Sequence, residues 1–530
     1  MELRPAIACL ALFVTATGSD GAASSSAVRA ELRQLVSQGR LTDLRWPRFS
    51  AHRKVVVRFY ETADFAPAWV RSSTVTPQGV ALIEAFDNAA SKGLNPEDYD
   101  SGRWSSRLDL LRSGRATERD VARFDLALTV SALRFASDLH SGRANPNESR
   151  ARFDVGGLNL ASWLRSQLVD ASDVPAALDS LEPRFEAYRR TEHALTIYRS
   201  LLSQGESEPF PSLSKPLKPG DASPALAQLA ARLAREGDLP SRSGIETTMY
   251  SGALVEAVKH FQTRHGLEPD GIVGRATQRA LNVPLRQRVQ QIELALERWR
   301  WLPHRFSRPP ILVNIPEFEL RALDETNRAA LQMKVIVGQA YGHQTPVFSA
   351  WMTHLIFRPY WDVPESIAQR ELLPKAAEDP EFLAKNHYET APVPSGGFRL
   401  RQAPGPDNAL GGVKFLFPNR YDVYLHGTPS VELFSKSRRD FSHGCIRVEK
   451  PDELAAWVLR DKPEWTLDRI REAMNASTPL RVDLDAPVPV FIVYGTAVAG
   501  TNGEVRFFDD IYGYDASLAR KLAAGRRAWM

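Results

Sequence analysis

Two short stretches, "YDVYLHGT" (421–428) and "SHGCIRV" (442–448), determine how the C-terminal half of this 530-residue chain is interpreted. The first alternates apolar and polar residues and follows "GVKFLFPN", so it predicts a β-hairpin around residues 418–420 with His426 at a strand end. The second places Cys445 two residues after His443. A cysteine nucleophile reacts as the thiolate and needs a base within hydrogen-bond reach, so both histidines are candidates for that base.

The chain contains only one other cysteine, Cys9, within an apolar run over residues 6–14. This run is shorter than the ~20 residues of a membrane-spanning helix, and small residues follow it up to Ala23. The sequence therefore predicts a cleaved signal peptide over residues 1–23 and an exported protein. Cys445 then has no disulfide partner within the chain, which marks it as either a reactive thiol or a buried, inert one.

Composition restricts the class of protein further. A length of 530 residues predicts several domains, and 43% hydrophobic and 25% charged residues are ordinary globular values. The net charge is only +4, without a block of lysine and arginine, so we expect no nucleic-acid partner. No later segment is apolar enough for a transmembrane helix, so none is expected after signal cleavage.

The first half of the chain has helical periodicity. Residues 27–205 predict a helical scaffold domain, completed after an insertion by a further helix over residues 286–303. The insertion, residues 217–285, predicts three helices, with Gly266 ending the second in a left-handed conformation. On that second helix, the spacing predicts that the amide of Gln262 points outward from the core.

The period changes to short β-type runs from about residue 306, which predicts a mostly-β domain over residues 306–520. A charged, helical stretch over about residues 364–395 interrupts these runs, and an insertion of this length is often a lid. The expected fold class is multidomain α+β: a helical scaffold, a three-helix unit, and a mostly-β domain with a helical lid.

Three interpretations of Cys445 compete: a metal ligand with His426 and His443, a structural thiol, and an acyl-transfer nucleophile. The histidine and cysteine spacing matches no zinc pattern. Arginines 438, 439 and 447 would supply positive potential for a thiolate. The N–H groups around Gly444 and Cys445 are candidates for an oxyanion hole. These features favour the nucleophile.

Two motifs resemble known families. Residues 217–285, with "LVEAVKHFQTRHGLEPDGIVGRATQRALN", are similar to the small peptidoglycan-binding domain. "HGT" and "SHGCIRV", with nineteen positions from His426 to Cys445, resemble the YkuD-type L,D-transpeptidase motif. With the helical region before them, the arrangement is similar to that of large periplasmic L,D-transpeptidases, in which carbapenems acylate the cysteine.

The resemblance implies roles for individual residues. Cys445 becomes the nucleophile and His426 the general base and acid, with the Gly427 carbonyl orienting the imidazole. His443 and Gly444 shape the loop beside the oxyanion hole. Substrate contacts are expected from the residues around this loop and strand: Tyr424, Ser442 and Arg447.

The implied reaction forms a 3→3 cross-link in peptidoglycan, a cell-wall biogenesis step that also bears on cell shape. It proceeds through a Cys445 thioester made from a tetrapeptide stem, and the acceptor is the side-chain amine of diaminopimelate. No metal or cofactor is expected, the location is the periplasm at the cell wall, and cell-wall synthases are a candidate partner class. Alternative functions are an L,D-carboxypeptidase, a transferase that attaches proteins to peptidoglycan, and a non-catalytic wall-binding scaffold.

Overall fold

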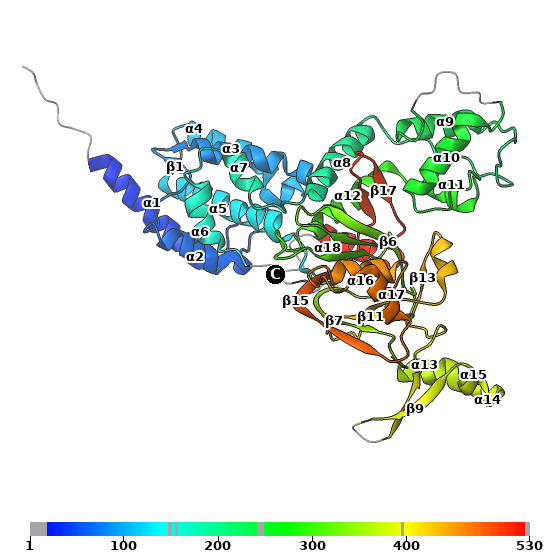
Figure 1. The fold of residues 1–530 in the computed structure, drawn as a ribbon. Helices are drawn as coiled ribbons and strands as arrows, with labels where there is room; N and C mark the ends of the chain where they lie inside the picture. The colour runs from blue at the N-terminus through cyan, green and yellow to red at the C-terminus, as the bar shows by residue number, and fades with distance from the viewer. Residues whose placement is uncertain (1–18, 147–150, 154–156, 241–247, 394–396, 525–530) are drawn as a thin grey trace, which may run out of the picture.

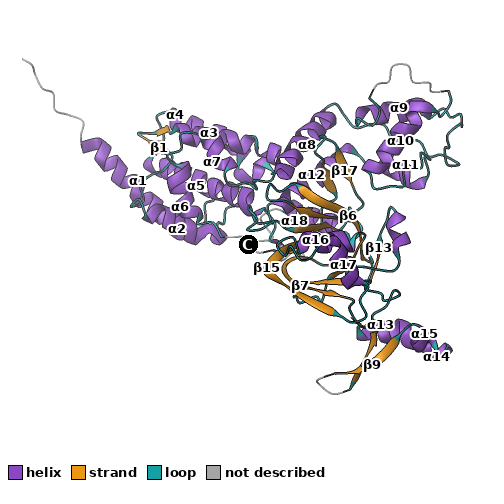
Figure 2. Cartoon of the chain, viewed as in Figure 1, coloured by secondary structure: helices purple, strands orange, loops and turns teal. Residues whose placement is uncertain are grey.

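The computed structural model describes residues 19–146, 151–153, 157–240, 248–393 and 397–524. Figure 1 shows a helical N-terminal region, a small helical unit, and a β-rich domain from which a lid region projects. The predicted fold class is thereby confirmed, as the division into helices and strands in Figure 2 shows. The expected signal peptide, residues 1–23, falls mostly outside the described residues and stays a prediction.

The N-terminal region is built around one long central helix, α5 (Glu118–Ser141). Thr117 begins it with a capping box, in which its hydroxyl accepts from Asp120 N–H while the Asp120 carboxylate accepts from Thr117 N–H. α5 is buried along most of its length. Around it lie α1 (Ser19–Gln38), α2 (Arg53–Glu61), α3 (Pro77–Asp87), α4 (Trp104–Arg112), α6 (Leu160–Trp163), α7 (Val174–Asp179) and the short hairpin β1 (Val70–Arg71) and β2 (Thr74–Val75).

Two further helices connect this region to the rest of the chain. α8 (Glu186–Ser203) and α12 (Leu285–Trp299) are far apart in sequence but share one apolar cluster, in which Tyr188 and Leu195 meet Ile292 and Leu296. The amphipathic stripe on α12 is thus buried against α8.

The small unit between them comprises α9 (Leu226–Arg235), α10 (Gly252–Arg264) and α11 (Arg275–Leu281) around a separate apolar core. Gly266 has a φ of +62°, which confirms the predicted left-handed residue after α10. The outward position expected for Gln262 is wrong, because this side chain is only 1% exposed. Its amide donates to Asp270 Oδ1 and Ile272 O and accepts from Gly271 N–H, so it satisfies the polar groups of a tight turn.

The C-terminal domain is a single main sheet. Its strands follow the order β11-β12-β14-β6-β5-β4-β15-β7-β3, and β11 also pairs with β7, so the sheet closes on itself. Its members are β3 (Ala151–Arg152), β4 (Ile311–Asn314), β5 (Glu319–Leu323), β6 (Ala329–Gly338), β7 (Val347–Phe357), β11 (Val413–Leu416), β12 (Leu425–His426), β13 (Asp440–Ser442), β14 (Ile446–Val448) and β15 (Leu480–Val493).

The inner face of this sheet, together with α16 (Pro451–Val458) and α17 (Leu467–Met474), forms the largest apolar core. Strand residues such as Val413, Phe415, Leu425 and Ile446 are almost fully buried in it. Because successive strand side chains point to opposite faces, their neighbours project from the other side of the sheet. That outer side carries the candidate catalytic residues.

The lid region (residues 361–402) combines helices with a β-hairpin. It contains β8 (Trp361–Asp362), α13 (Glu365–Ile367), the π-helical turn η7 (Ala368–Leu372), α14 (Leu373–Glu378), α15 (Phe382–Lys385), β9 (Tyr388–Pro392) and β10 (Phe398–Gln402). A small core of its own holds these elements together, including Ile367 and Leu372 with Phe382 and Tyr388. The helical stretch expected over residues 364–395 is therefore supported by strands on both sides, and the region projects from the domain (Figure 1).

A hairpin near the C-terminus, β16 (Ala497–Ala499) and β17 (Val505–Phe507), joins the parts of the molecule, and α18 (Tyr514–Ala523) follows it. Arg264 of α10 donates to Val505 O at 2.8 Å and forms a buried ion pair with Asp238. The Phe507 ring contacts Tyr198 of α8 edge-on, and Arg506 pairs with Glu317 of the main sheet domain. One hairpin thus contacts the small unit, the helical region and the sheet.

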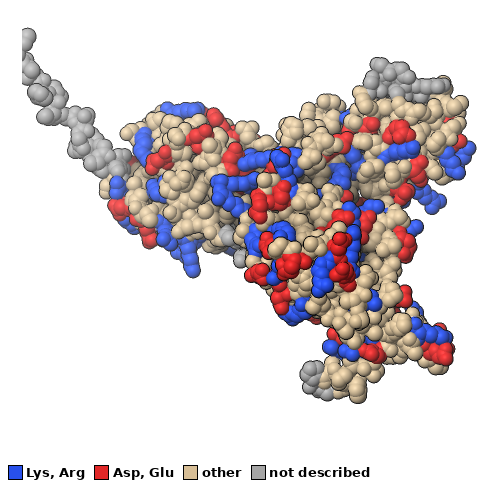
Figure 3. Space-filling view, viewed as in Figure 1, with Lys and Arg blue, Asp and Glu red and all other residues tan. Residues whose placement is uncertain are grey.

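The surface carries both charge signs. On the face shown in Figure 3, Lys and Arg are interspersed with Asp and Glu over all parts of the molecule. Within the described ranges, no helix combines the length and apolar character needed to cross a membrane.

Candidate active site

Four polar or reactive side chains share the outer face of two adjacent strands. β12 and β14 pair in parallel, with Leu425 opposite Ile446 and His426 opposite Arg447. Leu425 and Ile446 point into the core. The residues on either side of them therefore project outward together; they are Tyr424, His426, Cys445 and Arg447.

His426 is held firmly at the end of β12. Its imidazole is 5% exposed, and the Nδ1–H donates to the carbonyl oxygen of Gly427 at 2.5 Å. The Gly427 N–H in turn donates to Val413 O. Because a carbonyl only accepts, this bond fixes the tautomer and leaves Nε2 unprotonated. Burial, with repulsion from Arg447 and Lys414, lowers the pKa of His426 to about 3, so the ring is neutral.

Cys445 lies in the loop between β13 and β14 and is half-buried. The Ile446 N–H donates to Tyr424 O, which places the thiol beside Tyr424, and Sγ lies 3.7 Å from the carbonyl oxygen of Asp422. Burial raises the pKa of the Cys445 thiol, while hydrogen bonds from Tyr424 and the charge of Lys414 oppose that rise. The resting pair is therefore a thiol and, on the same face of the paired strands, a neutral imidazole with a free acceptor nitrogen.

Tyr424 contacts both members of this pair. Its ring centroid lies 5.6 Å from that of His426, and its hydroxyl forms a hydrogen bond with Cys445. Burial, reinforced by the nearby Cys445, raises the pKa of this phenol well above its usual value. Tyr424 is therefore a hydrogen-bond donor to the sulfur throughout the neutral pH range.

The loop that holds the thiol is shaped by internal hydrogen bonds. Gly444 has a φ of +118°, a conformation that disfavours other residues. The Ser442 hydroxyl donates to Cys445 O at 2.5 Å and accepts from Gly444 N–H at 3.1 Å. Thr345 Oγ1 donates to Gly444 O from the segment between β6 and β7. The loop is thus fastened at three points.

These bonds alter two of the sequence-based expectations. The Gly444 N–H is already bound to Ser442, so this donor is not free for an oxyanion hole, and Cys445 N–H is the remaining candidate. Ser442 is 3% exposed and both of its hydrogen bonds remain within the loop, so its contribution here is to loop shape rather than to substrate contact.

His443 points away from the pair to another part of the molecule. Its Nε2 lies 2.5 Å from Glu371 Oε1 in η7 of the lid region, and its ring contacts His343 edge-on at 4.7 Å between centroids. The structure therefore places His443 between the cysteine loop and the lid region.

The three arginines expected around the thiol differ in their surroundings. Arg438 pairs with Asp440, and Arg439 donates to backbone carbonyls of residues 318, 335, 436 and 437. Neither guanidinium is bound to Cys445, because Arg438 is paired with a carboxylate and Arg439 is bound to carbonyls of other segments. The positive potential expected from these two therefore stays a prediction. The Arg447 side chain has no hydrogen bond or ion pair to any described residue and remains on the outer face, where its guanidinium is available to an anion.

Lys414 is a site residue that the sequence analysis missed. It lies on β11 directly opposite His426, and its Nζ is 3.8 Å from the centroid of the Tyr424 ring. The signal was present in "GVKFLF", because alternation buries Val413 and Phe415 and so turns Lys414 to the side of His426 across the predicted hairpin.

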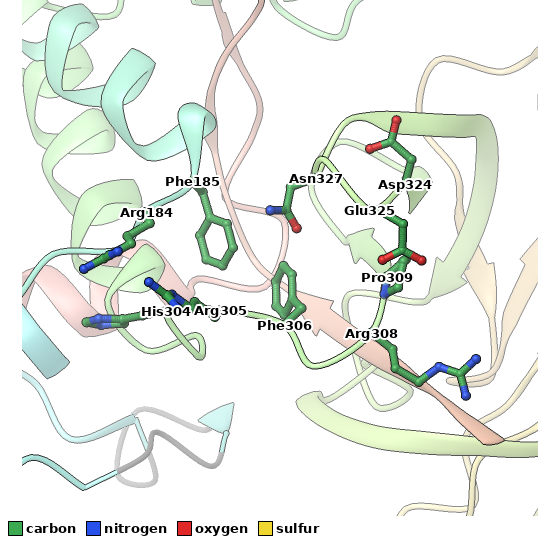
Figure 4. A pocket seen from close by; sticks show the side chains of 10 residues that line it. All are labelled: Arg184, Phe185, His304, Arg305, Phe306, Arg308, Pro309, Asp324, Glu325 and Asn327. Atoms are coloured by element: carbon green, nitrogen blue, oxygen red, sulfur yellow. The ribbon is translucent and has the colours of Figure 1, made fainter.

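The described residues contain no group of three or more His, Cys, Asp or Glu arranged to hold a metal ion. A pocket of about 290 Å³ lies where the start of α8 meets the segment before β4 and the β5–β6 turn (Figure 4). Phe185 and Phe306 line its middle, and none of its lining residues belongs to the cysteine loop or to β11, β12 or β14.

Family comparisons agree with this geometry. Residues 308–490 match the model of the L,D-transpeptidase catalytic domain (YkuD), residues 222–281 that of a putative peptidoglycan binding domain, and residues 54–195 that of a scaffold domain. The C-terminal part is thus an L,D-transpeptidase catalytic domain of the YkuD family. The chain as a whole combines it with a scaffold domain and a peptidoglycan-binding domain.

Individual proteins resemble parts of the chain. A protein of Haemophilus influenzae (strain ATCC 51907 / DSM 11121 / KW20 / Rd) named "Putative L,D-transpeptidase" is 31% identical over 245 residues, which cover 43% of this chain and 49% of that protein. The chain thus matches about half the length of this relative. The solved L,D-transpeptidases of Xylanimonas cellulosilytica (16% identity, TM-score 0.18, 53% of this chain and 100% of the other) and Stackebrandtia nassauensis (14%, 0.21, 53% and 97%) also match.

Proposed function

We propose that this protein is a periplasmic L,D-transpeptidase that forms 3→3 cross-links in peptidoglycan through a thioester on Cys445. The observation that carries the proposal is the arrangement of His426 and Cys445 on one sheet face, with the imidazole proton held at Nδ1 by Gly427 O. A neutral imidazole with a free Nε2 is suited to accept the thiol proton.

In the first step, Nε2 of His426 takes the proton from Sγ of Cys445, and the sulfur attacks the carbonyl carbon of the third residue of a tetrapeptide stem. The Cys445 N–H is the candidate donor to the developing oxyanion. Collapse of the intermediate breaks the bond to the terminal D-alanine, whose amine takes the proton back from His426. The products are a thioester and free D-alanine.

In the second step, the side-chain amine of diaminopimelate on a neighbouring stem attacks the thioester. His426 accepts a proton from this amine and returns it to the departing Cys445 sulfur, so the thiol is regenerated and a new amide bond links the stems. The alternatives transfer the same acyl group to water, as an L,D-carboxypeptidase, or to a protein amine.

Arg447 and the lid region support a peptide substrate. Stem peptides carry carboxylates, and the unpaired guanidinium of Arg447 lies on the same face as the thiol. The lid region contacts the cysteine loop through Glu371 and His443, so a substrate bound beside Cys445 would lie at its edge. A lid in this position would limit the access of water and favour transfer to an amine.

The remaining expectations follow from the domain combination. A peptidoglycan-binding domain beside an L,D-transpeptidase domain is consistent with a location at the cell wall. The boundaries 1–23, 27–205, 217–285 and 306–520, the lid at 364–395 and an interaction with cell-wall synthases stay predictions.

Product analysis tests the proposal directly. Purified protein incubated with disaccharide-tetrapeptides should yield a 3→3 cross-linked dimer by mass spectrometry, and the Cys445→Ala variant should yield none. If tripeptide is the sole product, the protein acts as an L,D-carboxypeptidase and the transpeptidase proposal is refuted. Cross-linking retained by Cys445→Ala, with an unchanged unfolding temperature, would remove the cysteine mechanism.

A further inference from the structure

Lys414 lies on the catalytic face without any role in the mechanism above. Its neighbours on β11, Val413 and Phe415, are fully buried in the core, so Lys414 projects to the opposite side. There it is paired across the strands with His426, and its ammonium lies over the ring of Tyr424. Tyr424 is in turn adjacent to Cys445, to which it is hydrogen-bonded.

This ammonium has no ion-pair partner among the described residues. Asp362 is paired with Arg399 at 3.0 Å, and Asp422 forms no ion pair with Lys414. The ammonium instead makes a cation–π contact with Tyr424, and such a contact replaces only part of the hydration that a half-buried ammonium loses. Burial accordingly lowers the pKa of Lys414. A cation in this condition gains free energy from any negative charge that appears beside it.

The charged surroundings identify which negative charge that is. The acidic groups that act on the Lys414 charge are Cys445, Asp362 and Asp422, and of these Asp362 is already paired with Arg399. The titratable and charged groups that act on the thiol are Tyr424, Lys414, Asp422 and Arg447, with Glu432 beyond Arg447, and His426 lies on the same face of the paired strands. The two cations near the thiol are Lys414 and Arg447. Of these, Lys414 also contacts Tyr424, whose hydroxyl is hydrogen-bonded to the sulfur.

We propose that Lys414 is the electrostatic partner of the Cys445 thiolate: its unpaired ammonium, positioned over Tyr424, stabilises the negative sulfur formed when His426 removes the proton. The proposal rests on the nucleophilic role of Cys445. The same positive charge disfavours a proton on His426, which keeps the ring ready to release that proton to the leaving amine. Lys414 acts through the sulfur and Tyr424, so it is a positioning residue in the thiolate's environment and exchanges no proton.

The pH dependence of thiol alkylation tests this role without any peptidoglycan substrate. In a Cys9→Ser background, the rate of iodoacetamide reaction at Cys445 is measured against pH for the unchanged lysine, Lys414→Met and Lys414→Arg. Lys414→Met removes the charge and should move the midpoint upward by about one pH unit, which slows alkylation about tenfold below the midpoint. Lys414→Arg retains the charge and should move it by much less. An unchanged midpoint in Lys414→Met, or equal shifts in both variants, would overturn the proposal.

A reciprocal measurement covers the case in which Lys414→Met does not fold. Electrostatic coupling between two groups acts equally on both, so removing the thiolate must lower the pKa of the lysine. NMR titration of ¹³C-methylated lysines, assigned with Lys414→Arg, should show a lower Lys414 pKa in Cys445→Ser than in the Cys9→Ser protein. Identical values in the two proteins would refute the coupling. These outcomes are independent of whether the acyl acceptor is a stem amine or water.

Discussion

The two histidines near Cys445 lie in regions of opposite character. His426 ends a strand, is almost fully buried, and donates to a backbone carbonyl that belongs to the same sheet edge. His443 lies on an exposed loop, and its partner is a carboxylate from the lid region, 72 positions away in sequence. Sequence proximity to the cysteine therefore does not identify the base. The proposal of His426 rests instead on its rigid backbone acceptor, which fixes one tautomer and keeps the second nitrogen free.

Replacing His426 should produce the largest effect. His426→Gln retains a polar side chain but removes the base, so we expect the rate of Cys445 acylation by a carbapenem to fall by about 10²–10⁴-fold. Stopped-flow fluorescence or intact-protein mass spectrometry measures this rate. His443→Gln is the matched control. A greater loss of acylation rate in His443→Gln would show that His443, and not His426, is the base.

The hydrogen bonds inside the cysteine loop should have the next largest effect. Ser442→Ala removes the bonds to Gly444 N–H and Cys445 O in a buried position, which we expect to cost about 1–3 kcal/mol of unfolding free energy. Acylation should also slow, since the thiol loses its fixed position relative to His426. Urea unfolding gives the first quantity. Wild-type stability in Ser442→Ala would show that these bonds do not hold the loop.

The burial of His426 predicts a dependence of stability on acid. The pKa of His426 is lowered to about 3 in the folded protein, so between its unfolded value near 6.5 and about 3 the unfolded chain binds more protons. The corresponding stability is present above pH 6.5 and is lost as the pH falls towards 3. Unfolding free energy should therefore decline more steeply over this window in wild type than in His426→Gln. Parallel curves would mean that His426 is not buried in its neutral form.

Loss of the contact between the lid region and the loop should have the smallest effect. Glu371→Gln removes the negative charge beside His443 in a partly exposed pair, which is worth at most about 1 kcal/mol. We expect acylation by a small carbapenem to change less than threefold. Formation of cross-linked dimer from stem peptides should decrease more, because in the proposed mechanism these larger substrates would extend to the lid region. Equal changes with the carbapenem and the stem peptide would show that the Glu371–His443 contact has no part in substrate selection.

Local patterns were sufficient for several parts of the structure. The change from helical to strand periodicity near residue 306 is a property of neighbouring residues and is observed. The antiparallel pairing before His426 is observed as well, although the connection is longer than residues 418–420 and the second strand is only Leu425–His426. Gly266 likewise adopts its expected conformation, because a left-handed residue after a helix depends on local sterics.

Features that depend on tertiary contacts were not predictable. Gln262 resembles an exposed residue on an amphipathic helix, yet the turn at residues 270–272 covers it and uses its amide. Arg438 and Arg439 are close to Cys445 in sequence, but a carboxylate and distant carbonyls bind them. The Gly444 N–H was expected to be free because the position of the Ser442 hydroxyl depends on its rotamer, which the sequence does not specify.

The β16–β17 hairpin has a consequence for the spacing between the parts of the molecule. Its contacts with Arg264, Tyr198 and Glu317 join three parts that separate linkers would leave free to rotate. A tethered domain samples a distribution of distances, whereas a clamped one keeps a single spacing. If the peptidoglycan-binding domain holds the wall polymer, the distance between the bound point on the polymer and Cys445 would then be fixed. The enzyme would then select stems by where they stand along the polymer as well as by their chemistry.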